Sequence, residues 1–162
     1  MKLTKNFSLR ELTRSQTAHR LDIDNTPSLP VIGNLRALCV YILEPVRNHF
    51  GVPFSPSSGY RSSELNKAIG SSSKSQHIKG CAADFEIPTV SNYNVAKWIV
   101  SNCSYDQLIL EFHNKEDPNS GWVHCSFVDV LKNRKKASIY DGKKWEPFLP
   151  IFLWLFIGGS FL

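Results

Sequence analysis

His77 and Asp84 are the residues whose types and spacing most clearly suggest chemistry. They are seven positions apart in the run Ser75-Gln76-His77-Ile78-Lys79-Gly80-Cys81-Ala82-Ala83-Asp84. Gly80 permits a tight turn after the histidine, and the small residues that follow permit close backbone packing. The chain then enters a predicted strand that carries Asp84. An imidazole at the end of a loop and a carboxylate on the next strand can converge on one cation.

His124 supplies a second imidazole from a predicted strand, in Gly121-Trp122-Val123-His124-Cys125-Ser126. Because side chains alternate along a strand, Trp122 shares its face. On the preceding predicted strand, Glu111 shares a face with Ile109. If a hairpin pairs Ile109 with His124, Glu111 opens onto the same surface as His124. A register slip of one residue would separate the two groups.

Two imidazoles and a carboxylate, from His77, His124 and Asp84, form the protein ligand set of a catalytic zinc site whose fourth position holds water. Zinc lowers the pKa of that water to about 7 and polarises a carbonyl. Glu111 would take the water's proton and pass it to a leaving amine. Arg61 could hold a substrate carboxylate or an oxyanion through its forked donors. The sequence therefore predicts one Zn2+ ion, with Glu111 and Arg61 as catalytic residues.

The elements that must position these residues fall into two groups along the chain. Helices come first: a capping box at Ser8 and Glu11 starts one, and an apolar stripe predicts a main helix over 30–50, kinked at Pro45. Shorter helices are expected over 63–69 and 91–103. Strands are predicted over 81–87, 107–112 and 122–128, the last two as an antiparallel hairpin. This order predicts an α+β fold, a single compact domain with N-terminal helices packed on a small antiparallel sheet that carries the zinc site.

Composition indicates one globular domain, since the chain has 162 residues, of which 42% are hydrophobic and 20% charged. A net charge of +5 suits an anionic partner. No recognition-helix pattern is present, and no strand interleaves basic and aromatic residues, so a nucleic acid is not expected as partner. The lysines and arginines over 132–144 are expected to form a solvated tail, with contact to anionic wall or lipid as the alternative. We expect a monomer.

The four cysteines lack any C-x-x-C pair, and residues 1–14 contain no apolar segment of the secretory type. These features predict synthesis in the cytoplasm without a signal peptide, with free thiols. Cys81 and Cys125 lie beside expected ligands, but a small buried hydrophobic role fits them better than a zinc-thiolate site. The remaining histidines His19, His49 and His113 are expected to be structural or exposed, although His113 lies close to Glu111.

A boundary is predicted between a peptidase domain, 1–146, and an apolar C-terminal tail, 147–162. The tail's sixteen residues carry no charge. As a helix they would reach roughly 24 Å, short of the ~30 Å hydrocarbon core of a membrane. A true span, a tail lying at a membrane surface, a segment packed on the domain and an unstructured end all stay open.

These blocks of residues together resemble the zinc D-alanyl-D-alanine carboxypeptidases and their phage endolysin relatives, most closely the short single-domain members of phages and prophages. The resemblance runs from about Phe7 to about Arg134. It rests on five blocks in the same order, at 58–62, 65–66, 75–84, 106–111 and 122–124. It implies a compact α+β domain, one zinc ion and hydrolysis of peptide bonds in peptidoglycan stem peptides. It also implies action on the cell wall, after phage-mediated release.

The resemblance also implies roles for individual residues, with His77, Asp84 and His124 as ligands and Arg61 and Ser75 in contact with substrate. We add Gln107, on the face of Glu111, to the substrate-binding residues. Many relatives carry the catalytic carboxylate three residues before the last histidine, where this chain has Gly121. Glu111 is our substitute, and Glu116 and Asp117 are the alternatives.

Three functions therefore compete. The first is a zinc peptidase, either a D-Ala-D-Ala carboxypeptidase or an endolysin-like endopeptidase, because both need the same zinc chemistry. The second is a cell-wall-binding or phage structural module of the same fold that does not cleave, which the glycine at 121 keeps open. The third is a membrane-associated accessory protein that depends on its apolar tail.

Overall fold

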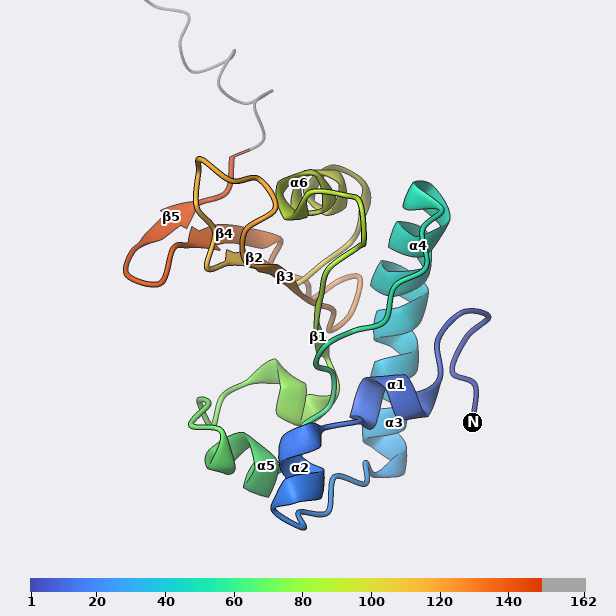
Figure 1. Cartoon of the computed structure of the whole chain (residues 1–162). Helices are drawn as coiled ribbons and strands as arrows, with labels where there is room; N and C mark the ends of the chain where they lie inside the picture. Colours follow the sequence, from blue (N-terminus) through green and yellow to red (C-terminus); the bar gives the residue numbers. More distant parts are fainter. Residues whose placement is uncertain (150–162) are drawn as a thin grey trace, which may run out of the picture.

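A computed structural model describes residues 1–149 and places helices around one five-stranded sheet (Figure 1). The spatial order of the strands is β1-β3-β2-β4-β5. Neighbouring strands are antiparallel except β2 and β4, which are parallel. The α+β prediction is therefore confirmed. The strands are β1 (Ala82–Phe85), β2 (Gln107–Glu111), β3 (Trp122–Ser126), β4 (Lys136–Tyr140) and β5 (Trp145–Pro147).

The helices confirm the expected order, with a short 3-10 helix, η2, inside the predicted loop around His77 and one additional α-helix. They are α1 (Leu9–Thr13), α2 (Gln16–Arg20), α3 (Leu29–Leu38), η1 (Cys39–Leu43), α4 (Glu44–Phe50), α5 (Ser63–Ala68), η2 (Gln76–Lys79) and α6 (Asn92–Asn102). The predicted capping box is present at α1, where Ser8 and Glu11 bond each other's backbone N–H groups. The addition, α2, is five residues long, too short for its apolar residues to show a helical period.

The main helix accommodates Pro45 by a π-helical turn, η1, placed just before it. The Glu44 N–H donates to the Cys39 carbonyl, an i to i+5 bond. Pro45 then falls in the first turn of α4, where its missing N–H costs no helical bond. Within the described residues, Leu29–Phe50 is the one helical run long and apolar enough to cross a membrane, but its apolar face is buried in the core.

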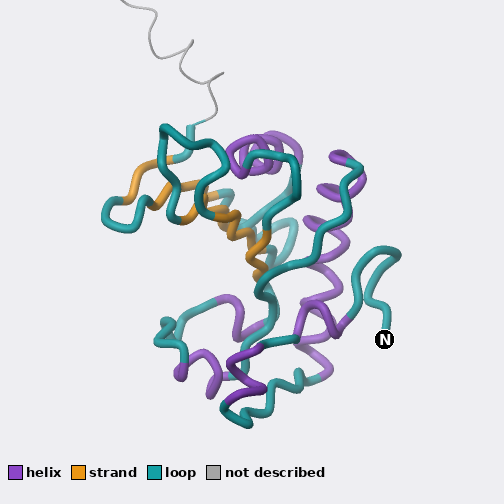
Figure 2. Tube along the Cα trace, viewed as in Figure 1, coloured by secondary structure: helices purple, strands orange, loops and turns teal. Residues whose placement is uncertain are grey.

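The two faces of the sheet have different tasks. One face is apolar and fully buried, and α6 packs against β2 and β3. Its side chains belong to Ala83, Phe85, Leu108, Leu110, Val123 and Cys125. The other face carries the candidate site. Asp84 pairs with His124, Ile109 pairs with His124, and Glu111 pairs with Trp122. The predicted antiparallel hairpin is thus confirmed, and it has the register on which the shared face of Glu111 and His124 depends. Figure 2 shows the strands gathered in one part of the molecule, with α2 and α5 in another.

The expectation of a solvated tail over 132–144 is wrong for the part that forms β4. Lys136–Tyr140 pairs along the full length of β2, and β5 pairs with β4. The strand was not predicted because lysines at 132, 135 and 136 gave the segment a basic, exposed pattern. Only its interior residue Ser138 is buried, so it has no apolar alternation. Phe148, just after β5, is also buried and donates its backbone N–H to the Ala137 carbonyl. The remainder of the predicted apolar tail, 150–162, lies outside the described residues.

Candidate active site

The structure brings His77, Asp84 and His124 together from three elements. His77 belongs to the short helix η2, while Asp84 and His124 are cross-strand neighbours on β1 and β3. All three side chains are buried, and one ligand atom from each lies within 4.8 Å of the others. Residues separated by forty-seven positions thus meet because the sheet pairs β1 with β3 and η2 leads directly into β1.

The donor atoms fit a small tetrahedral metal ion. His77 Nε2 lies 3.3 Å from Asp84 Oδ1 and 3.3 Å from His124 Nδ1, and the last two atoms are 2.8 Å apart. Ligands at ~2.0–2.1 Å from a tetrahedral zinc ion are themselves about 3.3 Å apart. Two imidazoles and a carboxylate are also a donor set that zinc prefers. These three residues could therefore hold one metal ion and leave a fourth position free.

The imidazole of His77 is fixed in the orientation that a metal ligand needs. Its Nδ1 donates to the Gly59 carbonyl at 2.6 Å, which leaves the lone pair of Nε2 directed at Asp84 and His124. Burial lowers the pKa of His77, although the neighbouring Asp84 opposes this, so burial favours the neutral ring that can coordinate a metal. Gly59 has no room for a side chain, because a Cβ there would overlap the Leu12 carbonyl.

Arg61 lies beside the predicted ligand Asp84. Its Nη2 donates to Asp84 Oδ2 at 2.9 Å, and its Nε donates to Ser58 Oγ at 3.0 Å. Burial opposes ionisation of Asp84, but hydrogen bonds from His124 and His77 and their charges hold its pKa below the usual range. The segment 57–58 also bonds to the Asp84 backbone, which covers the outer edge of β1 and places Arg61 there.

Glu111 lies at the end of β2, one strand away from His124. It faces the same side of the sheet, as the alternation along β2 and β3 requires. Burial raises the pKa of Glu111, and the charge of Asp84 raises it further, against the opposing effects of His124 and Arg61. A carboxyl with a raised pKa in reach of a metal-bound water is suited to accept a proton and later return it.

A cluster that the sequence analysis missed anchors the helix carrying His77. The Gln76 amide donates to Asp106 Oδ2 at 2.9 Å, and Arg134 makes a bidentate contact with the same carboxylate. Asp106 is 2% exposed. The cluster links η2 to the residue that precedes β2 and to the segment that precedes β4. Only the tertiary structure reveals it, because its members lie far apart in the sequence.

Replacing Asp106 by Asn should remove a pH-dependent part of the stability. The Arg134 hydrogen bonds lower the pKa of Asp106 from 3.8 to about 2. The ionised carboxylate therefore stabilises the fold above the unfolded pKa, by roughly 2 kcal/mol, and this contribution is lost as pH falls from about 4 to 2. Urea unfolding of both proteins from pH 7 to pH 3 tests this. The difference in free energy of unfolding between wild type and Asp106→Asn should become smaller as pH falls. A difference that stays constant with pH would contradict the assignment.

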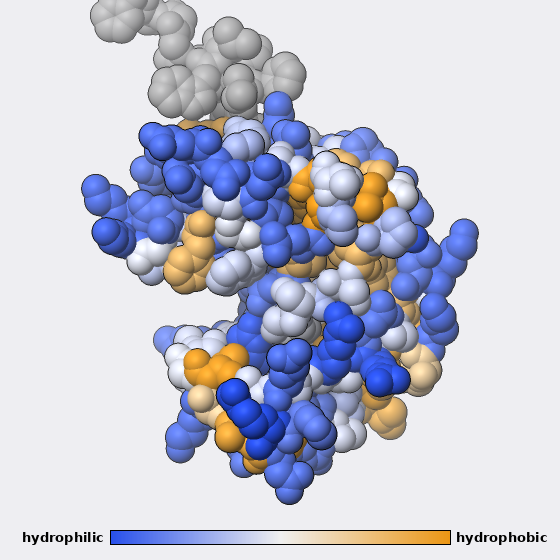
Figure 3. Space-filling model, in the orientation of Figure 1, coloured by the Kyte–Doolittle hydropathy of each residue, from blue (hydrophilic) through white to orange (hydrophobic). Residues whose placement is uncertain are grey.

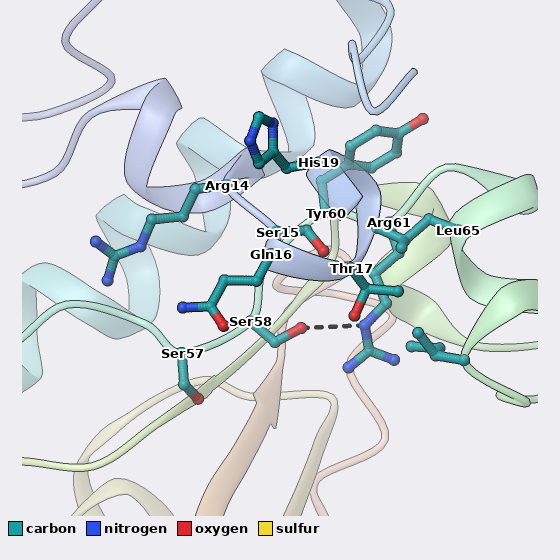
Figure 4. A pocket seen from close by; sticks show the side chains of 11 residues that line it. Arg14, Ser15, Gln16, Thr17, His19, Ser57, Ser58, Tyr60, Arg61 and Leu65 are labelled. Carbon is teal, nitrogen blue, oxygen red and sulfur yellow. Dashed lines mark hydrogen bonds between the residues drawn. The ribbon is translucent and has the colours of Figure 1, made fainter. Parts of the chain in front are cut away.

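An open cavity of about 690 Å³ adjoins this site on the side of α2 and α5. Arg61 and Ser58 line it together with Arg14 and Gln16, and Figure 4 shows the hydrogen bond between Ser58 and Arg61 at its wall. Figure 3 shows the same side of the molecule hollowed between the part with the strands and the part with α2 and α5. Arg61 connects this cavity to the metal-binding group, because it lines the cavity and also bonds Asp84.

The comparisons with known proteins agree with this geometry. Residues 5–126 match the family model described as Peptidase M15. The chain belongs to the M15 peptidase family. No curated protein matched the chain in a separate search. M15 peptidases are zinc-dependent metallopeptidases, and the His77, Asp84 and His124 group lies wholly within the matched residues.

The structure explains why this M15 peptidase has a glycine at position 121, where the resemblance implied a carboxylate. Gly121 has φ +69°, and a Cβ there would overlap the Glu111 carbonyl. No carboxylate can therefore occupy this position while β2 and β3 keep their register. Of the two loop alternatives, Glu116 lines a separate cavity with His113, and Asp117 bonds the backbone of Asn119.

Gly121→Ala should destabilise the protein by roughly 3 kcal/mol, because a side chain at positive φ is strained and its Cβ overlaps the Glu111 carbonyl. For a domain of this size we expect Tm to fall by about 10 °C. Gly33→Ala is the matched control, since a Cβ at that helical glycine meets nothing within 4 Å. Differential scanning calorimetry would measure both. An unchanged Tm in Gly121→Ala would contradict the close approach.

The other predicted residues of this M15 peptidase have structural partners. Ser75 caps η2, accepting from the His77 backbone N–H, and Gln107 begins β2, at the far end from Glu111. His113 is buried, hydrogen-bonded to Ser120 and stacked on Tyr93, as expected of a structural histidine. All four cysteines are free and none belongs to the metal-binding group. Burial raises the pKa of Cys39 to about 12, as expected of a small apolar residue.

Proposed function

We propose that this chain is a zinc-dependent peptidase that hydrolyses peptide bonds in the stem peptides of bacterial peptidoglycan. The observation that carries the proposal is the group of His77, Asp84 and His124, with Glu111 on the same face of the sheet. M15 membership supports peptide hydrolysis, and the resemblance to carboxypeptidases and endolysins supports the substrate class. Both a terminal D-Ala and an internal stem-peptide bond are compatible with the open cavity.

In this proposal His77, Asp84 and His124 hold the zinc ion. A zinc ion held there supplies an acidified water and polarises the carbonyl of the scissile bond. Glu111 removes a proton from the attacking water and holds it on a carboxyl oxygen. It then delivers that proton to the leaving amine nitrogen, which prevents the amine from re-forming the bond. The half-buried position of Glu111 raises its pKa, which favours both transfers.

Arg61 has two tasks in the proposed mechanism. Its Nη2 fixes Asp84, while the guanidinium lines the cavity that receives the peptide. Two donors of one planar group can therefore position a ligand and a substrate carboxylate together. Ser75 and Gln107 are proposed to contact the peptide. We further propose that the protein acts as a monomer on the cell wall after release from the cytoplasm, without a nucleic-acid partner. Contact of the apolar tail, 147–162, with a membrane surface is also part of the proposal.

Metal content and amine release, measured on the same sample, test the proposed function. The protein should be kept to residue 149 or beyond, because β5 and buried Phe148 belong to the fold. We expect one equivalent of zinc by elemental analysis and the release of amino groups from purified peptidoglycan. A chelator should stop the release and added zinc should restore it. Bound zinc without cleavage would instead support a wall-binding module. A protein that binds no metal would overturn the proposed three-ligand site.

A further inference from the structure

Four aromatic side chains form a continuous aromatic strip on the sheet: Trp122, Phe112, Tyr140 and Trp145. Their rings are in contact in that order. The ring centroids lie 5.0 Å apart between Phe112 and Trp122, and 5.4 Å between Phe112 and Tyr140. Tyr140 and Trp145 are stacked at 4.7 Å with an interplanar angle of 26°. The aromatic strip therefore crosses from β3 to the sheet edge at β5.

The aromatic strip begins at the candidate site. Glu111 pairs with Trp122 on one side and with Tyr140 on the other, and Tyr140 pairs with Trp145. Residues paired directly across neighbouring strands project to the same face. Trp145 is therefore two strands from Glu111, about 10 Å at the usual strand spacing. That distance corresponds to roughly three residues of an extended peptide.

Folding alone does not explain the aromatic strip. Phe112 is 49% exposed and Trp145 is 60% exposed, whereas the apolar residues on the other face of the sheet are buried. Two members, Tyr140 and Trp145, also lie beyond residues 5–126, the part that matches the M15 family. The outer half of the strip is thus a feature of this chain rather than of the matched family region.

We propose that the aromatic strip binds a sugar ring of the glycan strand to which the stem peptide is attached. This inference rests on the proposed function. Glu111 pairs with two members of the aromatic strip, Trp122 and Tyr140. A substrate that is cleaved at Glu111 therefore extends past the strip on one side. Large flat rings cover the apolar C–H face of a pyranose, and the Trp and Tyr polar groups can bond to hydroxyls at its rim.

An extended peptide fits this edge less well than a sugar does. The edge strand β5 is three residues long and includes Pro147, which has no N–H to donate. It therefore offers few backbone partners for strand addition. The nearby charges are also largely satisfied, since Lys115 pairs with Glu146, and Asp141 accepts from the backbone of Lys143 and Lys144. A neutral N-acetylated sugar is the occupant that this surface favours.

The test compares two substrates in the full-length chain: a free stem peptide, and the same peptide attached to a muramyl disaccharide. Trp145→Ala should lower kcat/KM about fivefold for the sugar-bearing peptide and leave the free peptide unchanged. Trp145→Phe, which keeps a ring, should restore most of the difference. Tyr41→Ala is the matched control, because Tyr41 is a 43% exposed aromatic that stacks on Phe127, away from the aromatic strip.

Binding of chitotetraose, followed by tryptophan fluorescence, is a second readout that does not need catalysis. Weaker binding of chitotetraose by Trp145→Ala than by Tyr41→Ala supports the sugar proposal, even if neither substrate is cleaved. Absence of cleavage of both substrates would overturn the peptidase function alone. Equal binding by wild type and Trp145→Ala overturns the sugar assignment. An equal loss of kcat/KM on both substrates would show that the strip binds the peptide. A wild-type dimer that becomes a monomer in Trp145→Ala would show that the strip binds a second copy of the chain.

Discussion

Replacing His77 or His124 by Ala is expected to abolish both metal binding and peptide hydrolysis. Each change removes one of three protein ligands whose donor atoms are within 3.3 Å of each other. Two remaining protein ligands hold a zinc ion much more weakly than three, so we expect at least a 100-fold loss of affinity. Activity should fall to background because the acidified water is lost with the metal. Zinc titration monitored by calorimetry, with amine release in parallel, measures both effects.

His49→Ala is the control for the two ligand variants. His49 is exposed and stacks on Trp98, and it belongs to no metal-binding group. It should keep wild-type zinc affinity and activity. A His77→Ala or His124→Ala protein that binds one equivalent of zinc with unchanged affinity would overturn the three-ligand site.

Glu111→Gln is expected to separate chemistry from metal binding. The amide keeps the size of the side chain and removes its ability to take a proton, so zinc content should stay at one equivalent. The rate should fall by about 10²- to 10⁴-fold, the usual contribution of a general base. Steady-state amine release at saturating substrate, with zinc measured on the same preparation, would show a loss in kcat.

The pH profile adds an independent check on Glu111. A general base must be deprotonated to act, and burial raises the pKa of this carboxyl above its ordinary value. Wild-type activity should therefore fall, as pH decreases, at a higher pH than for an exposed glutamate. The residual activity of Glu111→Gln should lack that acidic limb. Glu116→Gln, in an exposed loop, serves as control. Full activity in Glu111→Gln would refute the assigned base.

Local patterns in the sequence were enough to predict the main helices, the first three strands and the candidate metal-binding group. The capping box at Ser8 and Glu11 and the alternation over 107–111 and 122–126 depend on neighbours within a few residues, and the structure contains each of them. The alternation left the hairpin register as a condition, because a slip of one residue would have separated Glu111 from His124, and the structure meets that condition by pairing Ile109 with His124. The group of His77, Asp84 and His124 was predicted from residue types that suit a metal ion, and the structure brings these three side chains together.

Contacts between distant residues were decided by the tertiary structure alone. The bond from Arg61 to Asp84, the anchoring of Gln76 by Asp106 and the parallel pairing of β4 with β2 join segments between 23 and 30 positions apart. No local pattern in the sequence predicts such a pairing, since the partners become neighbours only when the strands assemble into the sheet. The aromatic strip has the same origin. Its rings come from β3, the end of β2, β4 and β5, and the strand order places them side by side.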